Sequence, residues 1–210
     1  MTIRIELKQS KNQIEKISSQ ITNYLNGKLR KNYSRVVNSL NQKIPVWIRE
    51  QPEIQSLLQQ GIPGELNTVF GLIPGQASLT VQNIIDAIKS STTINIEKLN
   101  RKYSGDISFS FQSSDFSNLL GLASGYVTTE KGENLHWLDW LLMRGDSVIL
   151  VGYQYEPTLG VGRSGGGIMV KSGFFRVPPQ YSGNPQNNFI TRAFSNREAE
   201  IQKIMMRLFE

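Results

Sequence analysis

The spacing of apolar residues changes twice along the chain, and these changes are what most limit the fold that it can adopt. Over residues 14–44, apolar side chains recur every three or four positions, the spacing of one face of an α-helix. Over residues 92–112 the period is two, which predicts antiparallel strands with a turn at residues 102–105. Helical spacing returns over residues 189–208. The order predicts an α+β fold in which an antiparallel sheet packs against long N-terminal and C-terminal helices.

Local features set the expected limits of these elements. Alternating apolar residues over Thr2–Leu7 predict a short strand, and Ser10 is the expected cap of the first helix. Pro45 is expected to end that helix, because proline lacks the N–H that a helix interior needs. Asn184 and Pro185 predict the start of the C-terminal helix, with proline at the first helical position.

The chain has 210 residues, which is enough for one domain with a single substantial core. No internal repeat or long linker divides it. We therefore expect one α+β domain over residues 1–210. Its N-terminal part, residues 1–75, is expected to be helical, and residues 76–210 form the α+β core. Within this core, the apolar stripe over residues 81–88 predicts a clear helix.

The positive charge of the chain is unevenly distributed. Residues 1–50 hold 10 Lys and Arg against 3 Asp and Glu, whereas the remaining 160 residues hold 13 against 14. A basic N-terminal segment of this kind can contact nucleic acid or an acidic partner. Polar residues are interspersed among these cations, so a solvated helix face explains the same pattern, and both interpretations remain open.

Composition removes several classes of chemistry. The chain has no Cys and one His, which excludes disulfides, thiolate nucleophiles and metal sites with several His ligands. The single His136 and Asp139 could form an acid–base pair, but no serine nucleophile with a supporting motif lies near them in the sequence. We therefore expect a core or interface role for this pair, no catalytic residue, no metal, no cofactor and no enzymatic activity.

Features of membrane or secreted proteins are missing from the sequence. The N-terminal residues lack the apolar core of a secretory signal, and no run of about 18 apolar residues occurs. We expect a protein made in a cytoplasm that has no membrane partner.

The glycines of the stretch GVGRSGGGIMV fit the spacing G-x-G-x-x-G of a dinucleotide-binding turn. Such a turn needs a helix directly after it, whose N–H groups bind the pyrophosphate. The residues that follow are β-branched and aromatic, which predicts a strand and a Gly-rich β-hairpin with its connection at residues 157–167. We expect Gly160, Gly162, Arg163 and Gly165 to contact a neighbouring subunit, with Arg163 binding a carboxylate. A flexible loop without a partner is the alternative.

Four blocks of the C-terminal third resemble neck and tail-completion proteins of tailed bacteriophages. They are L-H-W-L-D-W-L-L-M-R-G-D-S-V-I-L, G-R-S-G-G-G-I-M-V-K, F-R-V-P-P-Q-Y-S-G and N-N-F-I-T-R-A, in this order, within about residues 135–195. The resemblance implies a structural protein of the virion: a small α+β subunit of a homo-oligomeric ring, six-fold, that joins head and tail as a head–tail connector or tail terminator.

The resemblance also implies partners. They are further copies of the chain, neighbouring neck, portal or tail-tube proteins, and a passive contact with packaged DNA. It brings no catalytic residues. It implies synthesis in the host cytoplasm and a final place in the virion. The alternative function, suggested by the basic N-terminal segment alone, is a nucleic-acid-binding protein, for which salt-sensitive DNA binding is expected.

Overall fold

The computed structural model describes residues 11–113, 115–129, 132 and 134–210, which form two compact units. Of the described residues, unit 1 contains 11–40, 93–109 and 199–210, and unit 2 contains those within 41–92 and 110–198. The strand expected over Thr2–Leu7 and the cap expected at Ser10 lie outside the described residues. The expected single domain stays a prediction, because two compact units can belong to one domain.

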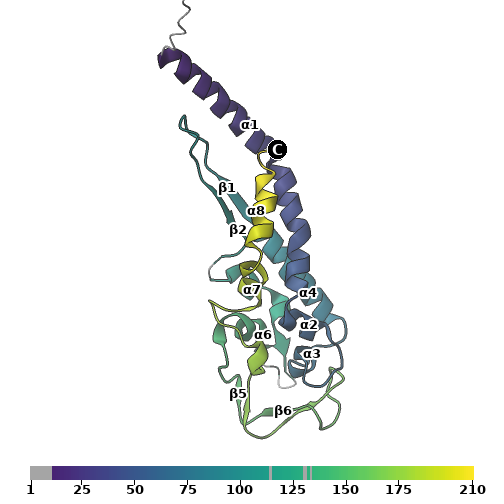
Figure 1. Ribbon diagram of the computed structural model, residues 1–210. Coiled ribbons are helices and arrows are strands. Elements are labelled where there is room, and N and C mark those ends of the chain that lie inside the picture. Colours follow the sequence, from purple (N-terminus) through teal and green to yellow (C-terminus); the bar gives the residue numbers. More distant parts are fainter. Residues whose placement is uncertain (1–10, 114, 130–131, 133) are drawn as a thin grey trace, which may run out of the picture. The chain divides into compact units, whose positions relative to one another are not determined.

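Unit 1 is built on the N-terminal part of the long helix α1 (Lys11–Arg49). The strands β1 (Thr93–Ile96) and β2 (Ile107–Ser110) pair with each other, and helix α8 (Glu198–Met206) runs alongside α1 (Figure 1). Asn26 of α1 holds the end of the strand pair, because its side chain accepts a hydrogen bond from Leu99 N (3.0 Å) and donates one to Leu99 O (3.3 Å). Asn32 donates to Leu208 O (3.2 Å), which fixes the chain after α8.

Helix α1 continues through Pro45, so the prediction that this proline ends the helix is wrong. A proline inside a helix costs about 3 kcal/mol, since it removes one hydrogen bond and its ring crowds the preceding turn. Ile44, Trp47 and Ile48 surround Pro45 on the helix and are fully or almost fully buried. Burial of a large apolar side chain contributes about 1.5–3 kcal/mol, so three of them offset the cost of the proline.

Unit 2 contains most of the short elements. Its helices are α2 (Pro52–Leu58), α3 (Leu66–Val69), α4 (Gln76–Ser91), α5 (Ser117–Leu120), α6 (Trp137–Asp139), which a π-helical turn extends over Trp140–Arg144, and α7 (Phe189–Ser195). Its strands are β3 (Val127–Thr128), β4 (Asn134–Leu135), β5 (Leu150–Val151), β6 (Gln154–Glu156), β7 (Ile168–Val170) and β8 (Phe174–Phe175). Short 3-10 turns lie at Ala123–Gly125 and Pro179–Tyr181.

The core of unit 2 lies where the sequence is densest in apolar residues. The stripe expected over residues 81–88 is buried on α4, as predicted. Trp137 is fully buried in α6 and packs against the ring of Phe70, with ring centroids 5.3 Å apart. Phe194 of α7 stacks on Phe111 at 3.5 Å and meets Trp47 edge-on at 5.7 Å. The core therefore joins segments from both ends of unit 2.

The strands form separate pairs rather than one antiparallel sheet. The pairs are β1–β2, β3–β4, β5–β8 and β6–β7, of which the last three are antiparallel. An α+β fold with a long N-terminal helix is confirmed. A continuous sheet does not form in the described chain, because the strands are two to four residues long and are interrupted by glycines. Gly152 and Gly173, which adopt φ angles of 80° and 53°, end β5 and precede β8.

The C-terminal helix differs from its prediction in two ways. It is divided into α7 and α8, and it begins at Phe189 rather than at Asn184 and Pro185. The side chain of Asn184 caps a turn, in which it accepts from the N–H groups of Gln186 (3.0 Å) and Asn187 (2.9 Å). The helix cap is Asn188.

Asn188 is fully buried and uses both ends of its side-chain amide. Its oxygen accepts from Ile190 N and Thr191 N, each at 3.0 Å, and its nitrogen donates to Leu142 O (3.2 Å) and Asn184 O (2.9 Å). The cap thus attaches α7 to the π-helical turn after α6.

We predict that Asn188→Ala destabilises the protein by about 2 kcal/mol or more. Loss of a helix cap costs about 0.5–2 kcal/mol, and the buried groups left without a partner add about 1–3 kcal/mol. Urea denaturation followed by circular dichroism measures the effect. Asn38→Ala, at an exposed position of α1, is the control and is expected to change stability by no more than about 0.5 kcal/mol. Equal midpoints for the two variants would contradict this role of Asn188.

Candidate functional site

The residues expected to contact a neighbouring subunit lie in the segment 157–167, which joins β6 to β7. The two strands pair antiparallel, with Glu156 opposite Ile168. After the glycines the chain enters a strand, as the β-branched residues predicted, so the turn lacks the following helix that a dinucleotide-binding turn requires. Gly160 and Gly165 adopt φ angles of 70° and 93°, a region that favours glycine.

Arg163 is bound to two backbone carbonyls of its own chain. Its Nε donates to Gly71 O (2.6 Å) and its Nη1 donates to Thr128 O (2.9 Å). These carbonyls come from the segment between α3 and α4 and from β3. A guanidinium has five N–H donors, and two of those of Arg163 are used in contacts with described residues of its own chain. The contact of Arg163 with a neighbouring subunit stays a prediction. The sequence did not indicate that Arg163 also binds two carbonyls within its own chain.

The remainder of the loop is packed onto residues 61–68 rather than standing free. Ser164 is buried and its hydroxyl donates to Thr68 O (3.4 Å). The hydroxyl of Tyr155 donates to Thr68 Oγ1 (3.0 Å) and accepts from Gly64 N (3.2 Å). A side chain on Gly167 would place its Cβ 2.4 Å from that hydroxyl, so the tyrosine requires a glycine there. The loop is thus held by polar contacts within unit 2.

His136 and Asp139 do not form the acid–base arrangement that their spacing allows. The carboxylate of Asp139 accepts a hydrogen bond from Arg144 Nε (2.7 Å). The ring of His136 stacks on Tyr126, with centroids 4.0 Å apart and planes 11° apart. Burial lowers the pKa of His136, and the nearby Asp139 carboxylate opposes this only partly. His136 is therefore a neutral packing residue at neutral pH, and its Nε2 is buried without a partner among the described residues.

One buried ion pair was not anticipated from the sequence. Glu53, in the first turn of α2, is fully buried and forms a salt bridge with Arg192 of α7. At its position in the first turn of α2, the carboxylate of Glu53 also interacts favourably with the helix dipole. No local pattern connects it with an arginine so far along the chain, so periodicity alone offered no signal.

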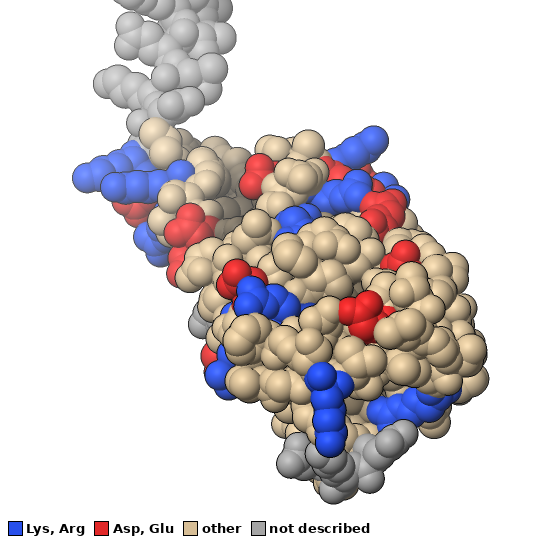
Figure 2. All heavy atoms as spheres, turned by 90° about the horizontal axis from the view of Figure 1, so that it is seen from below, with Lys and Arg blue, Asp and Glu red and all other residues tan. Residues whose placement is uncertain are grey.

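An exposed apolar surface is carried by the strands and loops at one end of unit 2. Val151 of β5 and Phe174 of β8 lie directly opposite each other and are 74% and 56% exposed. Four further exposed apolar residues lie nearby in sequence, and we call all six the strand surface: Val148, Val151, Leu159, Val161, Met169 and Phe174. Figure 2 looks at the end where β5 and β6 lie in Figure 1, and shows mostly uncharged atoms with a few scattered charges.

The part of the chain that the structure describes holds neither a metal-binding cluster nor a membrane-spanning helix. There, no three His, Asp or Glu side chains are grouped so that they could hold a metal ion. Within the same residues, no helix is long and apolar enough to cross a membrane.

Comparison with protein-family models, with curated proteins and with solved structures gave no match to this chain.

We predict that Arg163→Ala destabilises the isolated subunit by about 1–2 kcal/mol, because the carbonyls of Gly71 and Thr128 lose a charged donor. Thermal and urea unfolding measure the change. Arg176→Ala, which removes an exposed arginine close to β8, is the matched control and should unfold like the wild type. If both variants unfold like the wild type, the two hydrogen bonds of Arg163 do not support the fold.

Proposed function

We propose that this chain is a structural subunit of the head–tail junction of a tailed bacteriophage. It would form a neck or tail-completion ring, six-fold, that joins head and tail, and it would act without catalysis. The observation that carries the proposal is the strand surface, an exposed apolar region built by the segment that resembles such proteins. The proposed final location is the virion, after synthesis in the host cytoplasm.

The four resembling blocks are connected to one another in space, which supports the proposal. Gly145 N in the first block donates to Gly183 O in the third block (2.7 Å), and Ile149 N donates to Phe175 O (2.7 Å). Asn188 in the fourth block donates to Leu142 O in the first. A Cβ on Gly183 would lie 2.0 Å from Leu141 O, so this contact between the first and third blocks requires a glycine. A resemblance spread over four blocks carries more weight when they form one substructure.

The second block joins the same substructure through a strand. Its residues 168–170 form β7, which pairs with β6, and β6 in turn lies against β8. The strand surface therefore belongs to the resembling part of the chain. Within it, Val151 and Phe174 lie side by side, and adjoining exposed apolar side chains are typical of protein–protein contacts.

The geometry of the strand surface suits ring formation. A ring needs a heterologous contact, in which one surface of a subunit meets a different surface of its neighbour. The strand pairs of unit 2 have two strands each, so each strand has one edge free of its pair, and such edges can receive a neighbouring chain. The proposed partners are further copies of the chain and the adjoining neck, portal or tail-tube proteins.

We predict that the double substitution Val151→Asp with Phe174→Asp prevents assembly and leaves the subunit folded. Both side chains are largely exposed, so their loss affects the core little, whereas two carboxylates would have to be desolvated in an interface. Complementation of phage lacking the wild-type protein, followed by electron microscopy, should show heads and tails that are not joined. Leu79→Asp, at an equally exposed apolar position of α4 (61%), is the control and should assemble.

Two results would overturn the proposal. One is the absence of the protein from purified mature virions by mass spectrometry. The other is normal assembly of the Val151→Asp, Phe174→Asp variant when circular dichroism shows that it is folded. A cryo-electron microscopy map of the neck would place the subunit on the head side or the tail side.

A further inference from the structure

The positive charge of the protein belongs to unit 1 rather than to the N-terminal segment alone. Among the described residues, unit 1 contains 11 Lys and Arg against 5 Asp and Glu, whereas unit 2 contains 9 against 9. Part of this charge comes from the connection between β1 and β2, which carries Lys98, Arg101 and Lys102. Two elements that are far apart in the sequence thus bring cations to the same unit.

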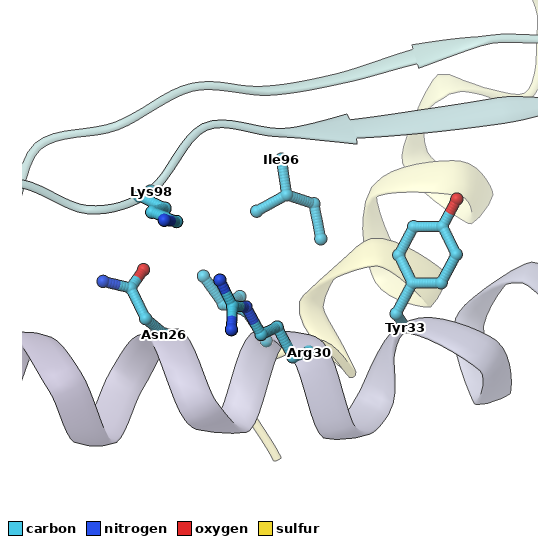
Figure 3. A pocket seen from close by; sticks show the side chains of 6 residues that line it. Asn26, Arg30, Tyr33, Ile96 and Lys98 are labelled. Atoms are coloured by element: carbon cyan, nitrogen blue, oxygen red, sulfur yellow. The ribbon is translucent and has the colours of Figure 1, made fainter.

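A cavity lies between these two elements. Its volume is about 400 Å³, within the range of small-molecule sites. Helix α1 and the strand β1 with the residues after it supply its lining: Asn26, Leu29, Arg30, Tyr33, Ile96 and Lys98. Figure 3 shows α1 on one side of the cavity and the strand pair on the other, with Arg30 extending from α1 and Lys98 lying on the strand side. The two hydrogen bonds between Asn26 and Leu99 fix the spacing of the two sides.

Arg30 and Lys98 are exposed, and within the described residues neither side chain has a hydrogen-bond or ion-pair partner. Other cations of the same helix are used differently, since Lys28 donates to Glu210 O (2.5 Å) and Arg35 pairs with the Glu210 carboxylate (3.7 Å). Two cations that face one cavity from opposite sides repel each other, and an anion between them removes this repulsion. The cavity is therefore suited to an anionic group.

We propose that this cavity binds the phosphate backbone of a nucleic-acid strand. The guanidinium of Arg30 can form paired hydrogen bonds to phosphate oxygens, and Lys98 can bind the same phosphate or its neighbour as a point charge. Leu29 and Ile96 add apolar side chains to the lining. Tyr33 adds an aromatic ring at one end. A phosphate attached to a sugar and a base uses both kinds of lining, whereas the carboxylate of an acidic peptide uses the cations alone.

The test measures binding of fluorescent oligonucleotides of about 20 nucleotides, single-stranded and duplex, by anisotropy between about 50 and 200 mM salt. The cavity variant is Arg30→Gln with Lys98→Gln. The matched control is Lys31→Gln with Lys102→Gln, which removes the same charge from the same two elements without altering the cavity lining. Circular dichroism melts confirm that both variants are folded.

We expect the cavity variant to bind at least one of the two oligonucleotides about tenfold more weakly or worse. The slope of log affinity against log salt should fall by about 1.4 for a single strand or about 1.8 for a duplex, the value for two lost phosphate contacts. The control should lose clearly less. The oligonucleotide, single-stranded or duplex, for which the cavity variant loses more affinity identifies the form of nucleic acid that the cavity binds.

Three outcomes would overturn the proposal. The first is no salt-dependent binding by the wild-type protein. The second is an equal loss in the cavity variant and the control, which would mean that charge acts diffusely and the cavity is not a site. The third is that poly-glutamate of equal charge competes as well as the oligonucleotide and also depends on Arg30 and Lys98, which would make an acidic protein the partner.

Discussion

The buried amide of Asn188 is the contact on which the arrangement of unit 2 depends most. It caps α7 and at the same time binds the carbonyl of Leu142, so the helix begins at a fixed point on the π-helical turn. The start of the helix decides where its later residues lie. Arg192 can then reach the buried carboxylate of Glu53, and Phe194 can enter the core between Trp47 and Phe111. A shift of the cap by one residue would rotate α7 by about 100° and separate both contacts.

Elements with a strong apolar period could be predicted from the sequence, whereas their ends could not. The stripes on α1 and α4 directly reflect which side chains are buried, so spacing revealed them. Local sequence rules predicted that Pro45 ends α1 and that α7 begins at Asn184. Tertiary packing overrode both rules. Burial of Trp47 and its neighbours outweighed the proline, and Asn188 became the cap in place of Asn184 because its amide has a buried partner, Leu142 O. A single sequence does not show which of two equivalent residues has such a partner.

The candidate sites show the same limit. The strand after the glycines could be predicted, because the β-branched residues that follow them are a local signal. The contacts of Arg163 are not local: Gly71 lies 92 positions and Thr128 lies 35 positions away in the sequence. Arg30 and Lys98, which line the cavity of unit 1, are likewise far apart in the sequence. The uneven charge of the sequence indicated a basic segment but not that these two cations line one cavity. The distribution of charge predicts which segments are basic, and the apolar period predicts which helix faces are buried. A site built from distant segments can be identified only from the folded structure.

The order of segments in unit 1 has a consequence for biosynthesis. This unit combines residues 11–40, 93–109 and 199–210. The second part of unit 2, within residues 110–198, lies between the last two of these segments. On the ribosome, α1 and the β1–β2 pair therefore emerge long before residues 199–210, which supply their last packing partner. The hydrogen bond from Asn32 to the carbonyl of Leu208 joins residues 176 positions apart, so it can form only after Leu208 has been synthesised. The chain is synthesised from its N-terminus, and domains generally fold as units. Unit 1 therefore cannot be completed until unit 2 has left the ribosome. Until then, α1 lacks the contacts that residues 199–210 make with it.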